Sequence, residues 1–312
     1  MPIAPVLMNP AYRCGSTTPW GGEGLRMMFG RDIPDSRTGE SLEVSALTGL
    51  ESRDPEGEKL TDLIARFGER LTGPGFAHPF PLLLKLLDAK DWLSVQVHPD
   101  SCGPQEGKTE AWHILFAAPG AELVFGVLPG AHRDALEKAA RAGTPVEKML
   151  RRVKVKAGET YYIPAGMLHA IGAGIILYQV QQADMVTYRF YDWNRTDARG
   201  NYRELNIEKA VEAVDVSFQQ GAVSETPLES GRLLLVKEKY FGLERFSGFE
   251  GSLPADPRRF SLLTAVRECR LSWEGGSLTL PAGRTALLPA QGYDLHLKAP
   301  AAMLAYPSVQ DL

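Results

Sequence analysis

The 312-residue chain carries 44% hydrophobic residues and a formal net charge of −4, which is enough apolar material for two ordinary domains or for one large β-fold with additions. No apolar run approaches the roughly 18 residues that a membrane span needs, and the opening Met1-Pro-Ile-Ala-Pro lacks the basic-then-apolar build of a signal peptide. Without a basic block, neither nucleic acid nor a membrane is expected as a partner, and we predict a cytoplasmic protein.

Most of the chain reads as short β-branched or aromatic runs broken by glycine and proline, which predicts a mainly β sandwich or barrel. A helix is predicted over 58–67, because Leu60, Leu63, Ile64 and Phe67 fall on one helical face. Strand patterns follow over 81–88, 92–98, 109–115, 159–163, 174–180 and 187–192.

A short helical insertion is predicted at about 129–152, between two of these strands. Residues 131–142 have a helical pattern that ends at Gly143. A second helix is predicted to start at once, with Thr144 as N-cap, Pro145 at the first helical position and Glu147 completing a capping box.

An internal repeat predicts a second, smaller β-domain. The segment 157–165, Ala-Gly-Glu-Thr-Tyr-Tyr-Ile-Pro-Ala, recurs with the same spacing as Ala-Gly-Arg-Thr-Ala-Leu-Leu-Pro-Ala at 282–290. The position of His169 in the first copy is taken by Asp294 in the second, with only His296 nearby. We therefore predict a metal-binding domain over 1–228 and a related domain without metal ligands over 229–312, with the boundary in the polar, turn-rich stretch at 225–235.

A metal site is predicted from residues of three strand segments. In 92–98 the two-residue period places Ser94, Gln96 and His98 on one face. Glu110 opens another apolar strand, and His169 follows a Pro-x-Gly turn. Two imidazoles, a carboxylate and a weaker amide ligand suit Zn²⁺, or less decisively Mn²⁺ or Fe²⁺. The remaining histidines and the scattered cysteines lack such settings and are predicted to be surface or core residues: His78, His113, His132, His296, Cys14, Cys102 and Cys269.

Three cations accompany the predicted ligands. Lys108 lies two residues before Glu110 and so points to the same face, where an anionic substrate would stabilise it. Lys85, within an apolar strand, either extends to the surface or points into a polar cavity. Arg189 alternates with aromatic residues and is either a surface residue or, if it faces the metal, a two-point holder of an oxyanion or phosphate.

Together these segments resemble type I mannose-6-phosphate isomerases in their short bacterial form, nearly from end to end. The matching pieces are Trp20-Gly-Gly, Gly39-Glu-Ser, Lys85-Leu-Leu-Asp-Ala, Ser94-Val-Gln-Val-His-Pro, Lys108-Thr-Glu-Ala-Trp, Tyr162-Ile-Pro-Ala-Gly, His169-Ala-Ile, Thr187-Tyr-Arg and Tyr191-Asp-Trp-Asn-Arg. The resemblance implies a cupin barrel, one Zn²⁺ per chain on Gln96, His98, Glu110 and His169, and Arg189 as the catalytic arginine with Lys85 and Lys108 in the pocket. The chain departs from the family at Leu42, Leu47, Gln179, Met185 and Asn206, which leaves the preferred sugar open.

The implied reaction interconverts mannose 6-phosphate and fructose 6-phosphate through a cis-enediolate, with Arg189 stabilising the developing charge. Such a reaction needs one base, and Glu40, Asp184 and a metal-bound water are the candidates. Lys108 or Lys85 would anchor the phosphate or a sugar hydroxyl. One alternative function is that of a cupin that binds a sugar or sugar phosphate without turnover, and another is that of an Fe²⁺ oxygenase. The chain is expected to be a monomer or a weak homodimer.

Overall fold

The computed structural model covers the whole chain and describes every residue except 102–106, 143–145, 197–198, 230 and 310–312. Strands dominate, and all pairings between named strands are antiparallel within three sheets. The prediction of a mainly β, cupin-like fold is therefore confirmed. No helix in the described part of the chain has both the length and the apolar character needed to cross a membrane.

Two of the sheets carry the predicted site. The six-stranded sheet has the order β2 (Ala11–Cys14), β3 (Thr38–Val44), β4 (Leu82–Ala89), β11 (Ile175–Gln182), β6 (Glu110–Ala117) and β9 (Thr160–Ile163). The five-stranded sheet has the order β12 (Tyr188–Tyr191), β5 (Val95–Val97), β10 (His169–Ile171), β7 (Glu122–Val127) and β8 (Leu150–Lys154).

The inner faces of these two sheets share one apolar core. Trp112 and Leu177 of the larger sheet pack in a single cluster with Phe125 and Ile171 of the smaller one, and each is at most 2% exposed. Burial of these large side chains holds the sheets face to face. The strand faces that continue beyond this core are free to line a cavity.

The third sheet has nine strands and is formed mainly by the C-terminal part of the chain. Its order is β1 (Val6–Met8), β19 (Thr285–Leu288), β16 (Ser261–Ala265), β20 (Leu295–Pro307), β15 (Phe241–Leu253), β14 (Arg232–Lys237) and β13 (Thr226–Pro227), with β17 (Cys269–Trp273) on β20 and β18 (Gly276–Leu280) on β17. Strand β1 comes from the start of the chain and pairs with β19. The domain division near residue 228 stays a prediction.

Both copies of the internal repeat form the same local structure. Gly158 and Gly283 each have a positive φ in a turn, and each turn leads into a four-residue strand, β9 or β19. Positive φ favours glycine, which explains why the glycine recurs at the same spacing. Asp294 is exposed and accepts a hydrogen bond from the Ala255 amide.

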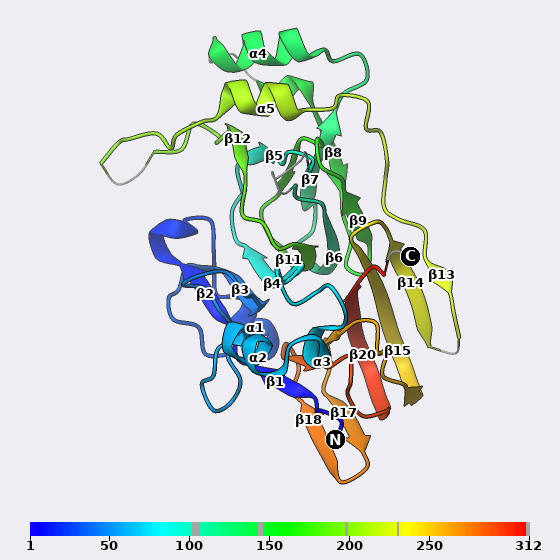
Figure 1. Cartoon of the computed structure of the whole chain (residues 1–312). Coiled ribbons are helices and arrows are strands. Elements are labelled where there is room, and N and C mark those ends of the chain that lie inside the picture. The colour runs from blue at the N-terminus through cyan, green and yellow to red at the C-terminus, as the bar shows by residue number, and fades with distance from the viewer. Residues whose placement is uncertain (102–106, 143–145, 197–198, 230, 310–312) are drawn as a thin grey trace.

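The helices are short. They are η1 (Gly15–Thr17), α1 (Gly24–Phe29), α2 (Leu60–Phe67), α3 (Glu69–Thr72), α4 (Arg133–Arg141), η2 (Val146–Met149) and α5 (Ile207–Ala213). In Figure 1, α4 and α5 lie together at one end of the molecule, and α1, α2 and α3 lie in its middle, where α2 and α3 share a buried core with β4 and β16. Helix α2 confirms the predicted helix at 58–67, and α4 lies within the predicted insertion. The expected cap residues Gly143, Thr144 and Pro145 lie outside the described residues, and only the 3₁₀ turn η2 follows them. Helices α1 and α5 were not predicted, since each is shorter than two full turns.

Candidate metal centre

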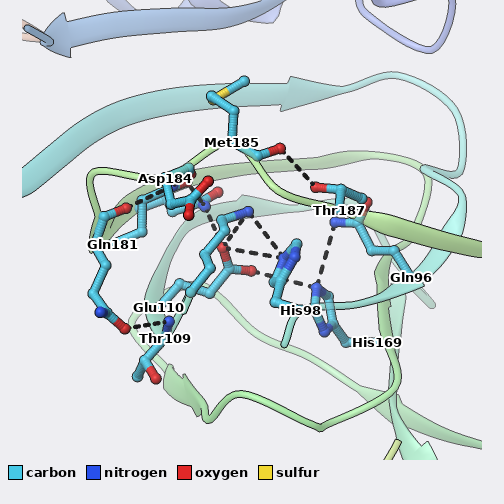
Figure 2. A network of polar contacts seen from close by, with 12 residues as sticks. Gln96, His98, Thr109, Glu110, His169, Gln181, Asp184, Met185 and Thr187 are labelled. Carbon is cyan, nitrogen blue, oxygen red and sulfur yellow. Dashed lines mark hydrogen bonds and ion pairs between the residues drawn. The ribbon is translucent and has the colours of Figure 1, made fainter. Parts of the chain in front are cut away.

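Three predicted ligands converge where the two inner sheets meet. His98 directly follows β5, Glu110 opens β6, and His169 opens β10. The Nε2 atom of His169 lies 3.4 Å from Glu110 Oε1, and that of His98 lies 3.8 Å from Glu110 Oε2. All three side chains are at most 1% exposed, and Figure 2 shows them pointing toward one another. In the described part of the chain they form a group of ligand atoms within 4.8 Å of each other.

The strand pairing and one turn bring these residues together. His169 pairs with Gln96 across β10 and β5. The turn before β10 is tied to the site by a hydrogen bond from the Gly166 amide to the His98 carbonyl. Gly166 has φ 84°, and a Cβ there would lie 3.2 Å from the Ala213 carbonyl oxygen. Glycine is therefore needed in the Pro-x-Gly turn that delivers His169.

Both imidazoles are oriented by backbone carbonyls. His98 Nδ1 lies 2.8 Å from the Val186 oxygen, and His169 Nδ1 lies 2.8 Å from the Met167 oxygen. Because a carbonyl only accepts, each neutral ring carries its proton on Nδ1 and turns the lone pair of Nε2 toward Glu110. This is the outer-shell arrangement typical of metal-binding histidines.

The charge states also suit a divalent cation. Burial lowers the pKa of His98 to about 3, with a further contribution from Lys108. Burial likewise lowers the pKa of His169. Burial opposes ionisation of Glu110, but Lys108 and the two histidines outweigh it and hold its pKa well below 4.5. The group thus offers two neutral imidazoles and one carboxylate at neutral pH.

The separations around His169 fit a tetrahedral ion, and the 3.8 Å between His98 Nε2 and Glu110 Oε2 is a few tenths of an ångström longer. Bonds of about 2.0–2.1 Å place the donors of a tetrahedral zinc site about 3.3–3.4 Å apart. His169 Nε2 lies 3.4 Å from Glu110 Oε1 and 3.4 Å from Gln96 Nε2. The lone pair of His169 and the carboxylate of Glu110 face each other with no proton between them, which is unfavourable unless a cation lies there. Rotation of the Gln96 amide would present its oxygen as the fourth ligand.

Two glutamines position Glu110: Gln179 donates a hydrogen bond to it, and Gln181 orients Gln179. Gln179 Nε2 donates to Glu110 Oε2 at 2.6 Å and to Gln181 Oε1 at 2.7 Å. Gln181 Nε2 donates in turn to the carbonyls of Gln182 and Asp184, at 3.0 and 2.7 Å. Since those carbonyls only accept, Gln181 must face Gln179 with its oxygen, and Gln179 must face Glu110 with its amide nitrogen. The backbone therefore fixes the direction of the whole chain of hydrogen bonds.

A cavity of about 290 Å³ opens beside this group. Gln96, Lys108 and Glu110 line it, and Lys108 Nζ lies 2.9 Å from His98 Nε2 and 3.0 Å from Glu110 Oε2. Burial lowers the pKa of Lys108, although Glu110 opposes this. The prediction that Lys108 shares a face with Glu110 agrees with these contacts.

The cavity wall also holds a second cluster of charges. Lys85, 4% exposed, points inward and donates to Glu40 Oε2 at 2.9 Å. Glu40 also binds Arg13 through Oε1 at 2.9 Å. Burial opposes ionisation of Glu40, but Lys85 and Arg13 outweigh it and lower its pKa. Of the two orientations expected for Lys85, the structure has the one in which the side chain points into the cavity.

Similar proteins identify the family. Residues 14–114 match the model of the phosphomannose isomerase type I catalytic domain. The putative mannose-6-phosphate isomerase YvyI of Bacillus subtilis is 32% identical over 313 residues, which cover 96% of this chain and 97% of the relative. The chain belongs to the type I phosphomannose isomerase family. A mannose-6-phosphate isomerase of Streptococcus mutans is 40% identical over 206 residues, 63% of this chain and 64% of the relative.

Solved structures agree with this family assignment. The crystal structure of the mannose 6-phosphate isomerase from Bacillus subtilis matches with a TM-score of 0.85 and 31% identity, covering 97% of this chain and 99% of that one. A mannose 6-phosphate isomerase described as holo and zinc bound shares the fold, with a TM-score of 0.78 and 16% identity over 98% of this chain and 100% of that one.

Of the other predicted catalytic residues, Arg189 lines the cavity and Asp184 does not. Arg189 pairs with Gln96 across β12 and β5 and donates to the Glu204 carbonyl at 2.8 Å. The Oδ1 atom of Asp184 accepts from the Val186 amide at 2.7 Å and stabilises the turn before β12. Asn206 holds the Arg189 backbone in both directions, at 3.1 and 2.7 Å.

Sequence reasoning missed two arginines of the cavity wall. Arg13 lies on β2 and Arg203 in the loop before α5, and both line the cavity. Arg13 has no signal from an alternating strand pattern or a motif with a known spacing, whereas Arg203 opens the Arg-Glu-Leu-Asn segment whose last residue, Asn206, is one of the departures from the family. The histidines left out of the metal site behave as predicted: His113 is buried against Thr160, while His78, His132 and His296 are exposed. Cys14 and Cys269 are free thiols, and Cys102 lies outside the described residues.

Proposed function

We propose that the chain is a zinc-dependent isomerase that interconverts mannose 6-phosphate and fructose 6-phosphate. The observation that carries the proposal is the His98, Glu110 and His169 group beside a cation-lined cavity, in a chain whose relatives bear the name mannose-6-phosphate isomerase. The relative described as zinc bound supports Zn²⁺. We propose one ion per chain, held by the three ligands and Gln96.

The reaction moves one proton between C1 and C2 and develops negative charge on the two adjacent oxygens of a cis-enediolate. A zinc ion bound at this group would polarise the carbonyl and stabilise that charge. Arg189 lies on the strand beside Gln96, so its guanidinium supplies a fixed positive charge to the same oxygens. Lys108 and Lys85 line the same cavity and bind sugar hydroxyls.

Glu40 is the proposed proton carrier among the side chains of the described cavity wall. Its lowered pKa keeps it ionised and able to accept a proton, and Lys85 and Arg13 hold the carboxylate in place. Asp184 has less support, because its carboxylate is occupied by the turn before β12.

The direct test is formation of fructose 6-phosphate from mannose 6-phosphate by the purified chain. The wild type should be active and a His98→Ala variant should lose zinc and turnover together, while Arg270→Gln, an exposed change on β17, should leave both unchanged. A folded, zinc-loaded wild type that binds the sugar phosphate but gives no product over hours would overturn the isomerase proposal in favour of a binding protein. The cytoplasmic location and the monomeric or weakly dimeric state stay predictions.

A further inference from the structure

The cavity wall carries more positive than negative charge. Five lining side chains are cationic (Arg13, Lys85, Lys108, Arg189 and Arg203) and two are carboxylates (Glu40 and Glu110), a net charge of +3 if all are ionised. A divalent ion at the metal centre would add to this excess. An anionic ligand is therefore needed to balance the cavity.

The excess is concentrated at the arginines. Lys108 is paired with Glu110, and Lys85 with Glu40. Arg13 has to share Glu40 with Lys85. Arg189 contacts a backbone carbonyl rather than a carboxylate in the described structure, and its buried Nε has no hydrogen-bond partner there.

The charge of Arg203 is only partly compensated. Its Nη1 is buried without a hydrogen-bond partner in the described part of the chain, and it lies 3.6 Å from Asp192 Oδ1. Arg195 also contacts that carboxylate oxygen. Burial lowers the pKa of Arg203, and the positive charges of Arg189, Arg195 and Arg13 lower it further against the opposing effect of Asp192. These contacts leave guanidinium donors available to an anion.

The position of the arginines matches one end of an open-chain sugar phosphate. Arg13 lies on β2, an edge strand of the six-stranded sheet, and Arg203 lies in the loop between β12 and α5. The side chains of Arg13 and Arg203 are each 30% exposed, whereas the metal group is at most 1% exposed. The cavity therefore runs from a buried metal centre to an arginine-lined mouth. In a hexose 6-phosphate, the reacting carbons C1 and C2 and the phosphate on C6 are at opposite ends.

We propose that Arg203, at the arginine-lined mouth, anchors the phosphate of the substrate in place of Lys85 and Lys108. This rests on the proposed function for the identity of the sugar, but the affinity for a phosphate group does not depend on turnover. The Arg203 guanidinium then selects phosphorylated over free sugars.

The test combines kinetics with direct binding. Inorganic phosphate should compete with mannose 6-phosphate. Arg203→Gln should raise both KM and the phosphate inhibition constant about 10- to 100-fold, the range for losing a hydrogen bond between charged groups. Its kcat should change less than about threefold, since binding at C6 is the same in ground and transition states. Arg203→Lys should recover part of the affinity, and Arg270→Gln, which removes the same charge from an exposed position on β17, should change nothing.

Unchanged KM and phosphate affinity in Arg203→Gln would overturn the proposal, as would a loss of kcat without a change in KM. If the chain turns over no sugar, calorimetric titration with inorganic phosphate still decides: weaker binding to Arg203→Gln than to the wild type supports the subsite, and equal binding refutes it. If Arg203→Gln does not fold, Arg203→Lys serves instead: its phosphate affinity should lie below that of the wild type, and equal affinity refutes the subsite.

Discussion

Gln179 offers the sharpest test of how the metal centre is held. In Gln179→Leu, Glu110 Oε2 loses its 2.6 Å hydrogen bond and the buried Gln181 Oε1 is left without its donor. A lost hydrogen bond to a charged group costs about 1.5–3 kcal/mol and an unsatisfied buried acceptor about 1–3 kcal/mol. We therefore expect the free energy of unfolding of the zinc-free protein to fall by about 3–5 kcal/mol. Zinc affinity should fall about 10- to 100-fold, as for other residues that orient a ligand.

Two measurements check this expectation. Competition with a chromophoric chelator gives the zinc affinity, and denaturant unfolding of the chelated protein gives the stability. Gln291→Leu, an exposed glutamine beyond β19, is the matched control and should match the wild type in both. Wild-type zinc affinity in a folded Gln179→Leu protein would refute the claim that the glutamine chain positions Glu110.

Three further predictions concern charge. Arg189→Ala should keep its zinc and lose about 10²- to 10³-fold in kcat, as for loss of one donor to a developing oxyanion; full turnover by a zinc-loaded variant would exclude the role given to Arg189. Glu40→Gln should lower kcat by about 10²-fold or more in a product-formation assay, and an unchanged rate would remove Glu40 as the proton carrier. The zinc-free protein should become less stable as the pH falls below 6.5, because burial lowers the folded pKa of His98 to about 3 and that of His113 to about 4, so the unfolded chain takes up these protons first. The contribution of these two histidines to the free energy of unfolding is fully present above pH 6.5 and is lost as the pH falls from that value to the folded pKa values. Unfolding midpoints that do not change between pH 7 and pH 5 would contradict this prediction.

The sequence is most informative where a short-range pattern determines the direction in which a side chain points. The alternation of 92–98 correctly placed Gln96 toward the cavity and Val95 and Val97 in the core. The Pro-x-Gly turn before His169 has a steric reason, since Gly166 has a positive φ against Ala213. Both signals depend on residues within a few positions of each other.

The parts of the site that could not be predicted from the sequence depend on contacts between distant segments. A lysine within an apolar strand is compatible with either face, and only Glu40, 45 residues earlier, explains why Lys85 points inward. Asp184 is a candidate base from its place in the chain, but its carboxylate accepts a hydrogen bond from the Val186 amide. Arg13 and Arg203 lie far apart in the sequence and line one cavity only in the folded structure.

The central claim is that catalysis depends on one zinc ion at His98, Glu110 and His169. The direct measurement is mannose 6-phosphate isomerisation by the chelated chain during titration with Zn²⁺. We predict that activity is lost on chelation and rises with added zinc until one ion is bound per chain. Isomerisation that persists in fully chelated protein, or zinc binding at one ion per chain without recovery of activity, would contradict the account.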